Sequence, residues 1–280
     1  MNIDQDDLLE LACRLAIRAG DAAQTRREEL GIGLVVGDTL VVETKSTSID
    51  LVTEVDRVAE ATIVGGLADA RPDDGVLGEE GASVAGTSRV RWIIDPIDGT
   101  TNLVYGIPSY SVSIAAEVDG AVIVGAVYDP AGEVLFAAAA GRGATRNGEP
   151  VACTSPRATD PTAHLAQALV ATGFGFSANR RRGQAEVLVT LLPQIRDIRR
   201  FGSAALDLCS VACGRVDGYY EKGLNYWDYA AGRLIASEAG AVLGDLRGGP
   251  GDSTFLLAAA PHVFEPLRSA LRSADADERP

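Results

Sequence analysis

Histidine and cysteine are scarce in this chain of 280 residues, which contains two histidines and four cysteines. His164 and His262 stand alone in the sequence, and the cysteines at positions 13, 153, 209 and 213 form no Cys-x-x-Cys pair. Zinc sites are usually built from such closely spaced ligands. The sequence therefore argues against a zinc centre and against a histidine or cysteine nucleophile, and it favours buried, reduced thiols.

The sequence also lacks long apolar runs and a basic character. No apolar run is long enough to span a bilayer, and the amino terminus, Met-Asn-Ile-Asp-Gln-Asp-Asp, is acidic and unlike a signal peptide. The formal net charge is −14 at pH 7, which argues against general nucleic-acid binding. We therefore expect a cytoplasmic protein without a membrane or nucleic-acid partner.

The most informative stretch is residues 89–102, Arg-Val-Arg-Trp-Ile-Ile-Asp-Pro-Ile-Asp-Gly-Thr-Thr-Asn. Its β-branched and aromatic residues predict a buried strand that ends near Asp95, because Pro96 has no N–H for a ladder. Asp95 and Asp98 then place two carboxylates at the end of that strand. Carboxylates this close repel each other unless a proton or a cation lies between them, and Mg2+ prefers oxygen ligands. For a bare Asp-x-x-Asp, an acidic turn that caps a helix is the simpler interpretation.

The full string resembles the metal-binding signature of the inositol monophosphatase family, the Mg2+-dependent, lithium-sensitive phosphatases. Three further motifs of that family appear in the family's order: Lys45 with Asp50-Leu51-Val52-Thr53-Glu54-Val55-Asp56, then Gly78-Glu79-Glu80, then Trp227-Asp228. The resemblance extends from about residue 8 to about residue 270. It implies an α/β (α+β) fold, the αβαβα layered sandwich shared with fructose-1,6-bisphosphatase, and usually a homodimer.

The same resemblance implies a set of metal-binding residues that offer oxygen ligands. They are Glu79, Asp95, Ile97 through its carbonyl, Asp98 and Asp228. In the family, the positions of Glu79, Asp95 and Ile97 hold one Mg2+, and those of Asp95, Asp98 and Asp228 hold a second. The position of Glu79 can also share a third, looser metal. Two metals can supply a nucleophile and stabilise the leaving oxygen in an in-line displacement.

The resemblance further implies catalytic and substrate-binding residues. The catalytic set is Glu79, Thr100, Asp56, Glu80 and Lys45. The substrate-binding set is Asp98, Gly99, Thr100, Ala204, Glu221 and Asp228. In the family, the threonine orients the attacking water with the matching aspartate behind it, while the second glutamate of the Gly-Glu-Glu motif helps to position water. The lysine lies near the phosphate or a water, the N–H groups at the helix start can bind phosphate, and Ala204, Glu221 and Asp228 match positions that contact inositol hydroxyls.

The choice of substrate is less firmly implied than the metal chemistry. After Asn102 the family commonly has an aromatic residue and a histidine, whereas this chain has Leu103, Val104 and Tyr105. Relatives with the same metal scaffold hydrolyse fructose 1,6-bisphosphate, histidinol phosphate or adenosine 3′,5′-bisphosphate, and a regulatory or binding protein on the same fold is a further alternative. No expected metal ligand is missing, which favours an enzyme. We therefore predict a phosphatase that hydrolyses myo-inositol monophosphate to inositol and phosphate.

Hydrophobic periodicity predicts helices and strands throughout one domain, with two packed halves at about 1–154 and 155–273 and a polar, frayed tail at 274–280. Helices are expected at 5–30, 50–70, 184–192, 202–212, 227–239 and 261–273. Strands are expected at 75–78, 111–115, 121–128, 133–140, 166–172, 196–201, 216–221, 242–246 and 255–260, in addition to the strand that ends near Asp95. A β-hairpin is expected at 34–42. The alternation of strands and helices in two blocks predicts stacked layers of sheet and helix.

Overall fold

The computed structural model describes residues 3–32, 35–36, 39–40, 54–156 and 159–278. The amino-terminal half forms an eight-stranded sheet with the strand order β10-β9-β8-β7-β6-β5-β3-β4. β3 and β5 are parallel to each other, and every other neighbouring pair in this sheet is antiparallel. The strands are β3 (Gly75–Gly78), β4 (Ser83–Val84), β5 (Val90–Asp98), β6 (Ser111–Val118), β7 (Ala121–Asp129), β8 (Val134–Ala139), β9 (Ala144–Arg146) and β10 (Glu149–Val151).

The carboxy-terminal half forms a five-stranded sheet with the order β12-β11-β13-β15-β14. β11 runs parallel to both β12 and β13, whereas β15 is antiparallel to β13 and β14. The strands are β11 (Leu169–Thr172), β12 (Asp197–Arg199), β13 (Gly218–Glu221), β14 (Val242–Gly244) and β15 (Leu256–Ala259). Part of the expected hairpin near residue 38 is described, as a small sheet in which β1 (Val35–Val36) pairs antiparallel with β2 (Thr39–Leu40).

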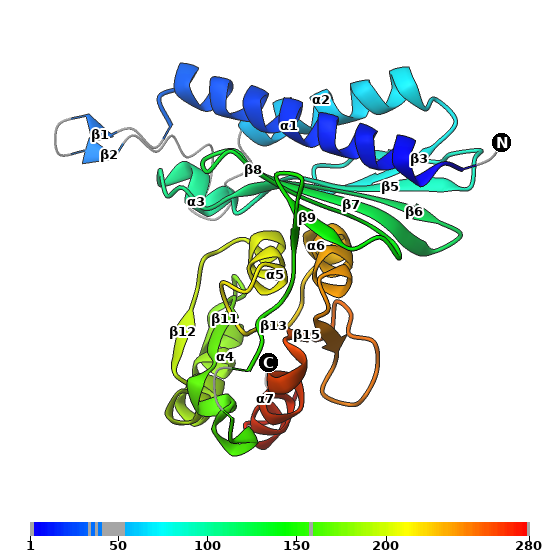
Figure 1. Cartoon of the computed structure of the whole chain (residues 1–280). Helices are drawn as coiled ribbons and strands as arrows, with labels where there is room; N and C mark the ends of the chain where they lie inside the picture. Colours follow the sequence, from blue (N-terminus) through cyan, green and yellow to red (C-terminus); the bar gives the residue numbers. More distant parts are fainter. Residues whose placement is uncertain (1–2, 33–34, 37–38, 41–53, 157–158, 279–280) are drawn as a thin grey trace.

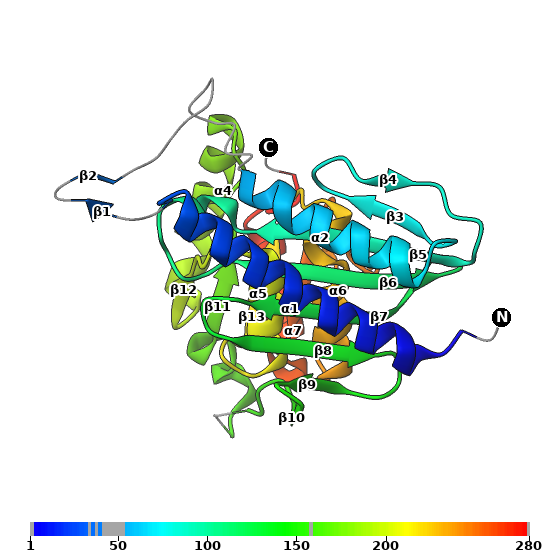
Figure 2. The ribbon, with the colours of Figure 1, turned by 90° about the horizontal axis from the view of Figure 1, so that it is seen from above.

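Helices separate and cover the two large sheets, which gives the expected αβαβα sandwich (Figure 1). α1 (Gln5–Glu29) and α2 (Glu54–Ala70) lie across the outer face of the eight-stranded sheet (Figure 2). α5 (Ala204–Ala212) and α6 (Tyr226–Glu238) lie between the sheets. The outer helices of the second half are α4 (Ala178–Leu191) and α7 (Pro261–Ser273). Short helical segments complete the chain: α3 (Thr100–Val104), η1 (Pro161–Ala163), η2 (Leu165–Gln167) and η3 (Leu192–Gln194).

Hydrophobic spacing explains how α1 packs on the sheet. Its buried residues, among them Leu8, Leu11, Leu15 and Ala19, recur every three or four positions and form one face. At the amino terminus of the helix, the carboxylate of Asp4 accepts a hydrogen bond from the N–H of Asp6 at 2.9 Å and thereby caps the helix.

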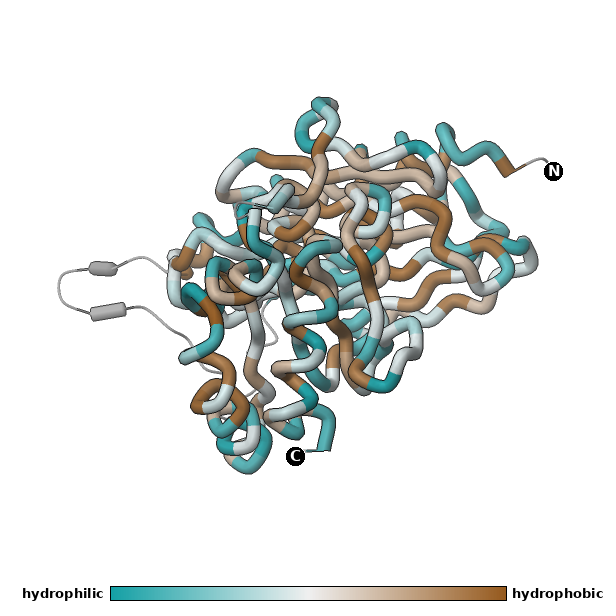
Figure 3. Tube along the Cα trace, turned by 60° about the horizontal axis from the view of Figure 1, so that its bottom comes forward, coloured by the Kyte–Doolittle hydropathy of each residue, from teal (hydrophilic) through white to brown (hydrophobic). Residues whose placement is uncertain are grey.

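Figure 3 shows hydrophobic residues running through the interior segments and hydrophilic residues gathering at the peripheral turns. Among the described residues, no helix has both the length and the apolarity needed to cross a bilayer.

The expected end of the central strand near Asp95 was wrong, because β5 continues to Asp98. Asp95 pairs with Ser113, and the next paired position is Asp98 with Ser111, so β5 has one extra residue at this point. This β-bulge contains Pro96, whose missing N–H therefore leaves no gap in a regular ladder.

Two boundaries and the tail also differ from the expectations. β11 begins at Leu169 because residues 165–167 form a 3-10 turn. α4 begins at Ala178, several residues earlier than its apolar spacing indicated. The hydroxyl of Ser177 accepts a hydrogen bond from the N–H of Arg180 and caps the helix there. The segment after α7 packs against the second half and is not frayed over its described part: Ala274 and Ala276 are buried.

Candidate active site

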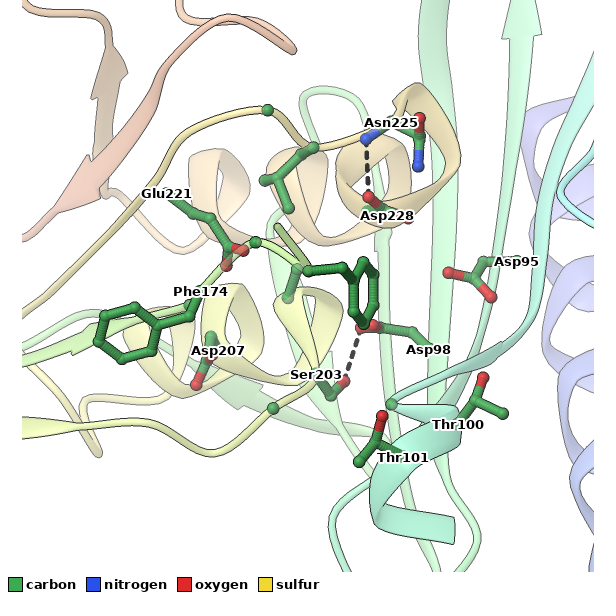
Figure 4. Close-up of a pocket in the computed structure, with 18 of the residues that line it drawn as sticks. Asp95, Asp98, Thr100, Thr101, Phe174, Ser203, Asp207, Glu221, Asn225 and Asp228 are labelled. Carbon is green, nitrogen blue, oxygen red and sulfur yellow. Dashed lines mark hydrogen bonds between the residues drawn. The ribbon is translucent and has the colours of Figure 1, made fainter. Parts of the chain in front are cut away.

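A pocket of about 370 Å3 lies where the two halves of the chain meet. Small-molecule sites commonly have volumes of this order. The first half contributes the end of β3 and the turn from β5 into α3; the second half contributes the loop after β11, the start of α5, and the segment from β13 into α6 (Figure 4). Six of the described residues that line it are acidic: Glu79, Asp95, Asp98, Asp207, Glu221 and Asp228.

The bulged end of β5 fixes the first two aspartates of the central motif. An oxygen of Asp95 accepts a hydrogen bond from the N–H of Ile97 at 3.1 Å. The Oδ2 atom of Asp98 accepts two hydrogen bonds from the second half, from the hydroxyl of Ser203 at 2.6 Å and from the N–H of Ala205 at 2.7 Å. The start of α5 is thereby attached to the central motif across more than 100 residues of sequence.

Gly99 turns the chain from β5 into α3 with a φ of 97°, which side chains other than glycine rarely tolerate. A Cβ at this position would also lie 3.0 Å from the carbonyl oxygen of Ser109 and 3.1 Å from that of Gly202. The glycine therefore allows the close approach that brings Thr100 to the edge of the pocket.

Thr100 connects the central motif to α2. Its hydroxyl lies 3.1 Å from an oxygen of Asp56 and 3.0 Å from the carbonyl oxygen of Ile97. Asp56 is 2% exposed and stands behind Thr100, outside the lining of the pocket. This is the arrangement that the resemblance implied, in which the aspartate fixes the threonine hydroxyl.

The acidic residues raise one another's pKa values. Burial, followed by the charges of Glu79, Asp98 and Asp228, raises the pKa of Asp95 well above its usual range. Burial raises the pKa of Asp98 to about 7, although the hydrogen bonds from Ser203 and Ala205 oppose the shift. Burial and the charge of Asp98 raise the pKa of Asp228 to about 8, although the hydrogen bond from the N–H of Asn225 opposes the shift. Burial raises the pKa of Glu79 as well, although its hydrogen bond with Asp95 opposes the shift.

This donor set fits a hard divalent cation. Two hydrogen-bonded carboxyl groups, those of Glu79 and Asp95, need a shared proton or a cation between them. Carboxylate and carbonyl oxygens are the ligands that Mg2+ prefers, and a cation would offset the repulsion that raises these pKa values. In the part of the chain that the structure describes, no three His, Cys, Asp or Glu side chains form a preassembled metal-binding group. The fit therefore rests on the chemistry and common location of the donors.

Of the expected catalytic residues, Glu80 lies outside the pocket lining and Lys45 is not described. Glu80 does not line the pocket; its N–H donates to a carboxylate oxygen of Glu60 at 3.0 Å. Burial and the charges of Asp56 and Glu79 raise the pKa of Glu80 to about 7, so it adjoins the acidic cluster. Lys45 lies outside the described residues.

The expected substrate contacts of the second half meet in the pocket. Ala204, Glu221 and Asp228 all line it, together with Asp98 and Gly99. A carboxylate oxygen of Glu221 accepts a hydrogen bond from the hydroxyl of Tyr219 at 2.8 Å. A Cβ at residue 173 would lie 1.9 Å from the same carboxylate, so a larger residue at that position would force the Glu221 side chain to shift.

Several lining residues were not identified from the sequence, among them Phe174, Arg180, Arg200 and Asp207. The two arginines and Phe174 lie outside the recognised motifs, and no sequence signal distinguishes them. Asp207 does have a signal, because it interrupts the apolar run Ala-Ala-Leu-Asp-Leu-Cys at the start of α5. An acid within an apolar helix is rarely buried without a specific reason.

Comparison with known proteins matches nearly the whole chain to one family. The model of the "Inositol monophosphatase family" matches residues 4–275. A Mycobacterium tuberculosis protein named "Inositol-1-monophosphatase SuhB" is 44% identical over 277 residues, which cover 95% of this chain and 93% of the relative. An Escherichia coli protein named "Nus factor SuhB" is 38% identical over 86% of both chains. The solved structure of Mycobacterium tuberculosis SuhB has a TM-score of 0.80 at 41% identity and covers 98% of this chain and 99% of its own.

Proposed function

The chain belongs to the inositol monophosphatase family, and we propose from this that it hydrolyses myo-inositol monophosphates to inositol and inorganic phosphate. The observation that carries the proposal is the pocket itself, where the family's carboxylate positions from both halves of the chain lie together. The name of the 44% identical relative supports the same substrate class. Phosphate monoesters hydrolyse extremely slowly in water, so a site for this reaction must provide strong electrostatic stabilisation.

We propose Mg2+ as the cofactor. Glu79, Asp95 and the carbonyl of Ile97 would hold one ion, and Asp95, Asp98 and Asp228 would hold a second. Bound Mg2+ supplies positive charge to the phosphate oxygens and lowers the pKa of water. The resemblance also supports a cytoplasmic homodimer, for which sedimentation of the purified protein is the direct measurement of assembly.

The residues of the chain would orient the reactants. The hydroxyl of Thr100 is fixed by Asp56 and the carbonyl of Ile97, and it would accept a hydrogen bond from the attacking water. As the water oxygen bonds to phosphorus, the bond from phosphorus to the inositol oxygen breaks. Overall, one proton of the water ends on the inositol oxygen, and the other stays with the phosphate. Glu221 would accept hydrogen bonds from the inositol ring hydroxyls on the other side of the pocket. Alignment of this kind can contribute a large part of a rate enhancement.

The carboxylate of Glu221 would repel a second phosphate placed directly beside it, which supports a monophosphate as the substrate. A non-catalytic binding protein on the same fold would be free to lose a carboxylate from the pocket. The expected carboxylate ligands Glu79, Asp95, Asp98 and Asp228 all line it, which supports hydrolysis.

Steady-state phosphate release in the presence of Mg2+ tests the proposal. The substrates are inositol 1-phosphate, fructose 1,6-bisphosphate, histidinol phosphate, adenosine 3′,5′-bisphosphate and a simple aryl phosphate. We expect the highest kcat/KM for inositol 1-phosphate and loss of turnover when a chelator removes the metal. A higher kcat/KM for a bisphosphate, or no turnover of any phosphate ester, would contradict the proposed substrate or the proposed activity, respectively.

A further inference from the structure

Asp207 is a buried carboxyl group in the pocket that the roles proposed above do not use. It lies in the first turn of α5, is 1% exposed, and lines the pocket together with Ala204 and Glu221. Its Oδ1 atom has no hydrogen-bond partner among the residues that the structure describes. A buried oxygen without a donor costs free energy, so such an atom calls for a donor from a ligand or from water.

The backbone around Asp207 is held in place by the turn that also binds the central motif. Its N–H donates to the carbonyl oxygen of Ser203 at 2.9 Å. The hydroxyl of the same Ser203 and the N–H of Ala205 both donate to Asp98. The position of Asp207 is therefore fixed relative to the acidic cluster, which is what a substrate contact requires.

Asp207 lies on the part of the pocket that is remote from the attacking water. Figure 4 shows it with Glu221 and Phe174, on the opposite side of the view from Asp95 and Thr100. Glu221, Asp98 and Arg200 are the charged groups that act on it. Rotation about the Cβ–Cγ bond of an aspartate is soft, so either carboxyl oxygen can turn toward a donor.

A purely structural role does not account for this residue. The residues on either side of it in α5, Leu206 and Leu208, are apolar, and the hydrogen bond of its backbone would form with any residue other than proline at this position. Burial of an acid where an apolar side chain would pack costs free energy unless its oxygens receive donors. Within the described chain the Oδ1 atom receives none.

We propose that Asp207 and Glu221 form a hydroxyl-reading subsite, in which each carboxyl group accepts a hydrogen bond from a different hydroxyl of the substrate ring. This proposal rests on the proposed hydrolysis of inositol monophosphate and specifies its substrate class. The substrate is a cyclic polyol monophosphate with at least two free hydroxyls on the side of the ring away from the phosphate. An aryl phosphate has no hydroxyl to place there and gains nothing from Asp207.

The test compares inositol 1-phosphate with an aryl phosphate for the wild type, Asp207→Ala and Asp207→Asn in saturating Mg2+. We expect Asp207→Ala to lower kcat/KM for inositol 1-phosphate by about tenfold, as the loss of one hydrogen bond to a buried acceptor does. Turnover of the aryl phosphate should stay within about twofold of the wild type. Asp207→Asn keeps one acceptor oxygen and should restore part of the loss. Ser210→Ala, which removes another buried polar group of α5 outside the pocket, should affect neither substrate.

Monodeoxy analogues of inositol 1-phosphate sharpen the comparison. Asp207→Ala should have no effect on the one analogue that lacks the hydroxyl read by Asp207, and Glu221→Gln should have no effect on a different analogue. Equal losses on inositol 1-phosphate and aryl phosphate, no loss on either, or equal sensitivity of all analogues would overturn the proposal.

Failure of the proposed function is a separate outcome. If the wild type hydrolyses the aryl phosphate but no inositol phosphate, the proposed function is wrong, and free inositol then tests the subsite as an inhibitor of aryl phosphate hydrolysis. An inhibition constant that rises about tenfold in Asp207→Ala supports the subsite. An unchanged constant, or no inhibition of the wild type, overturns it.

Discussion

Replacement of Asp98 by asparagine separates the proposed metal-binding role of this residue from its role in the fold. Both of its hydrogen bonds with the second half, from Ser203 and Ala205, end on the same oxygen, Oδ2. The carbonyl oxygen of an asparagine can take that position and keep both bonds. The amide NH2 then replaces Oδ1, the oxygen that remains for a cation. Asp98→Asn should therefore remove an anionic metal ligand and leave the contact between the two halves in place.

The expected effect on activity is large. Loss of a residue that hydrogen-bonds to a metal ligand typically costs about 10–100-fold in metal affinity or activity. Loss of a charged residue that binds the metal directly should cost at least as much. We expect kcat/KM to fall by about 100-fold or more, which corresponds to about 2.7 kcal/mol of transition-state stabilisation. The Mg2+ concentration for half-maximal activity should rise, because the site loses one negative charge.

The thermal stability of the metal-free protein, unlike its activity, should not fall on this substitution. Burial raises the pKa of Asp98 to about 7, which means that the fold disfavours the charged form. An uncharged asparagine removes that penalty, so the Tm of the metal-free variant at pH 8 should equal or exceed that of the wild type. Phosphate-release kinetics across a Mg2+ titration and thermal unfolding in a chelator provide the two measurements. Near-normal turnover in saturating Mg2+ would refute the metal assignment, and a large drop in Tm would refute the reasoning about the shared oxygen.

Three further predictions concern specificity, inhibition and stability. Glu221→Gln should weaken hydrolysis of inositol 1-phosphate by about 1–3 kcal/mol and spare an aryl phosphate, because one charged acceptor for ring hydroxyls is lost; steady-state kinetics that show equal effects on both substrates would exclude Glu221 as a specificity residue. Lithium should inhibit turnover by competing at the position formed by Asp95, Asp98 and Asp228, and kinetics unaffected by Li+ would show that this site departs from the inhibited members of the family. Asp74→Asn should lower the free energy of unfolding at pH 7 by about 1–3 kcal/mol, because the carboxylate accepts hydrogen bonds from Arg71, Ser88 and Trp92. Burial raises the pKa of Asp74, but these bonds lower it by more, so the carboxylate stabilises the fold above the ordinary aspartate pKa of about 4, and this stabilisation is lost as the pH falls through the lowered pKa. In chemical unfolding at pH 7 and at acid pH, the difference in unfolding free energy between variant and wild type should shrink at the lower pH. A difference that does not depend on pH would contradict this account.

The sequence by itself determined the features that depend on neighbouring residues. The spacing of Asp95 and Asp98 brings two carboxylates to one turn, whatever the rest of the fold does. The periodic apolar face of α1 and its Asp4 cap likewise follow from residues within a few positions of one another. The central motif is long enough to identify the family, and through it the expected positions of metal ligands such as Asp228 in the distant second half.

The tertiary structure decided what depends on residues far apart in the chain. Pro96 falls in a bulge because of how β5 pairs with β6, which no local rule predicts. The contact of Thr100 with Asp56 spans 44 residues, and that of Asp98 with Ser203 spans 105. In the sequence, Asp207 is only an acid in an apolar helix; the fold brings it into the pocket that Glu221 also lines. Local sequence fixes the chemistry that each segment can offer, but the packing of the two halves sets the distances between their side chains, and those distances decide which groups can act together.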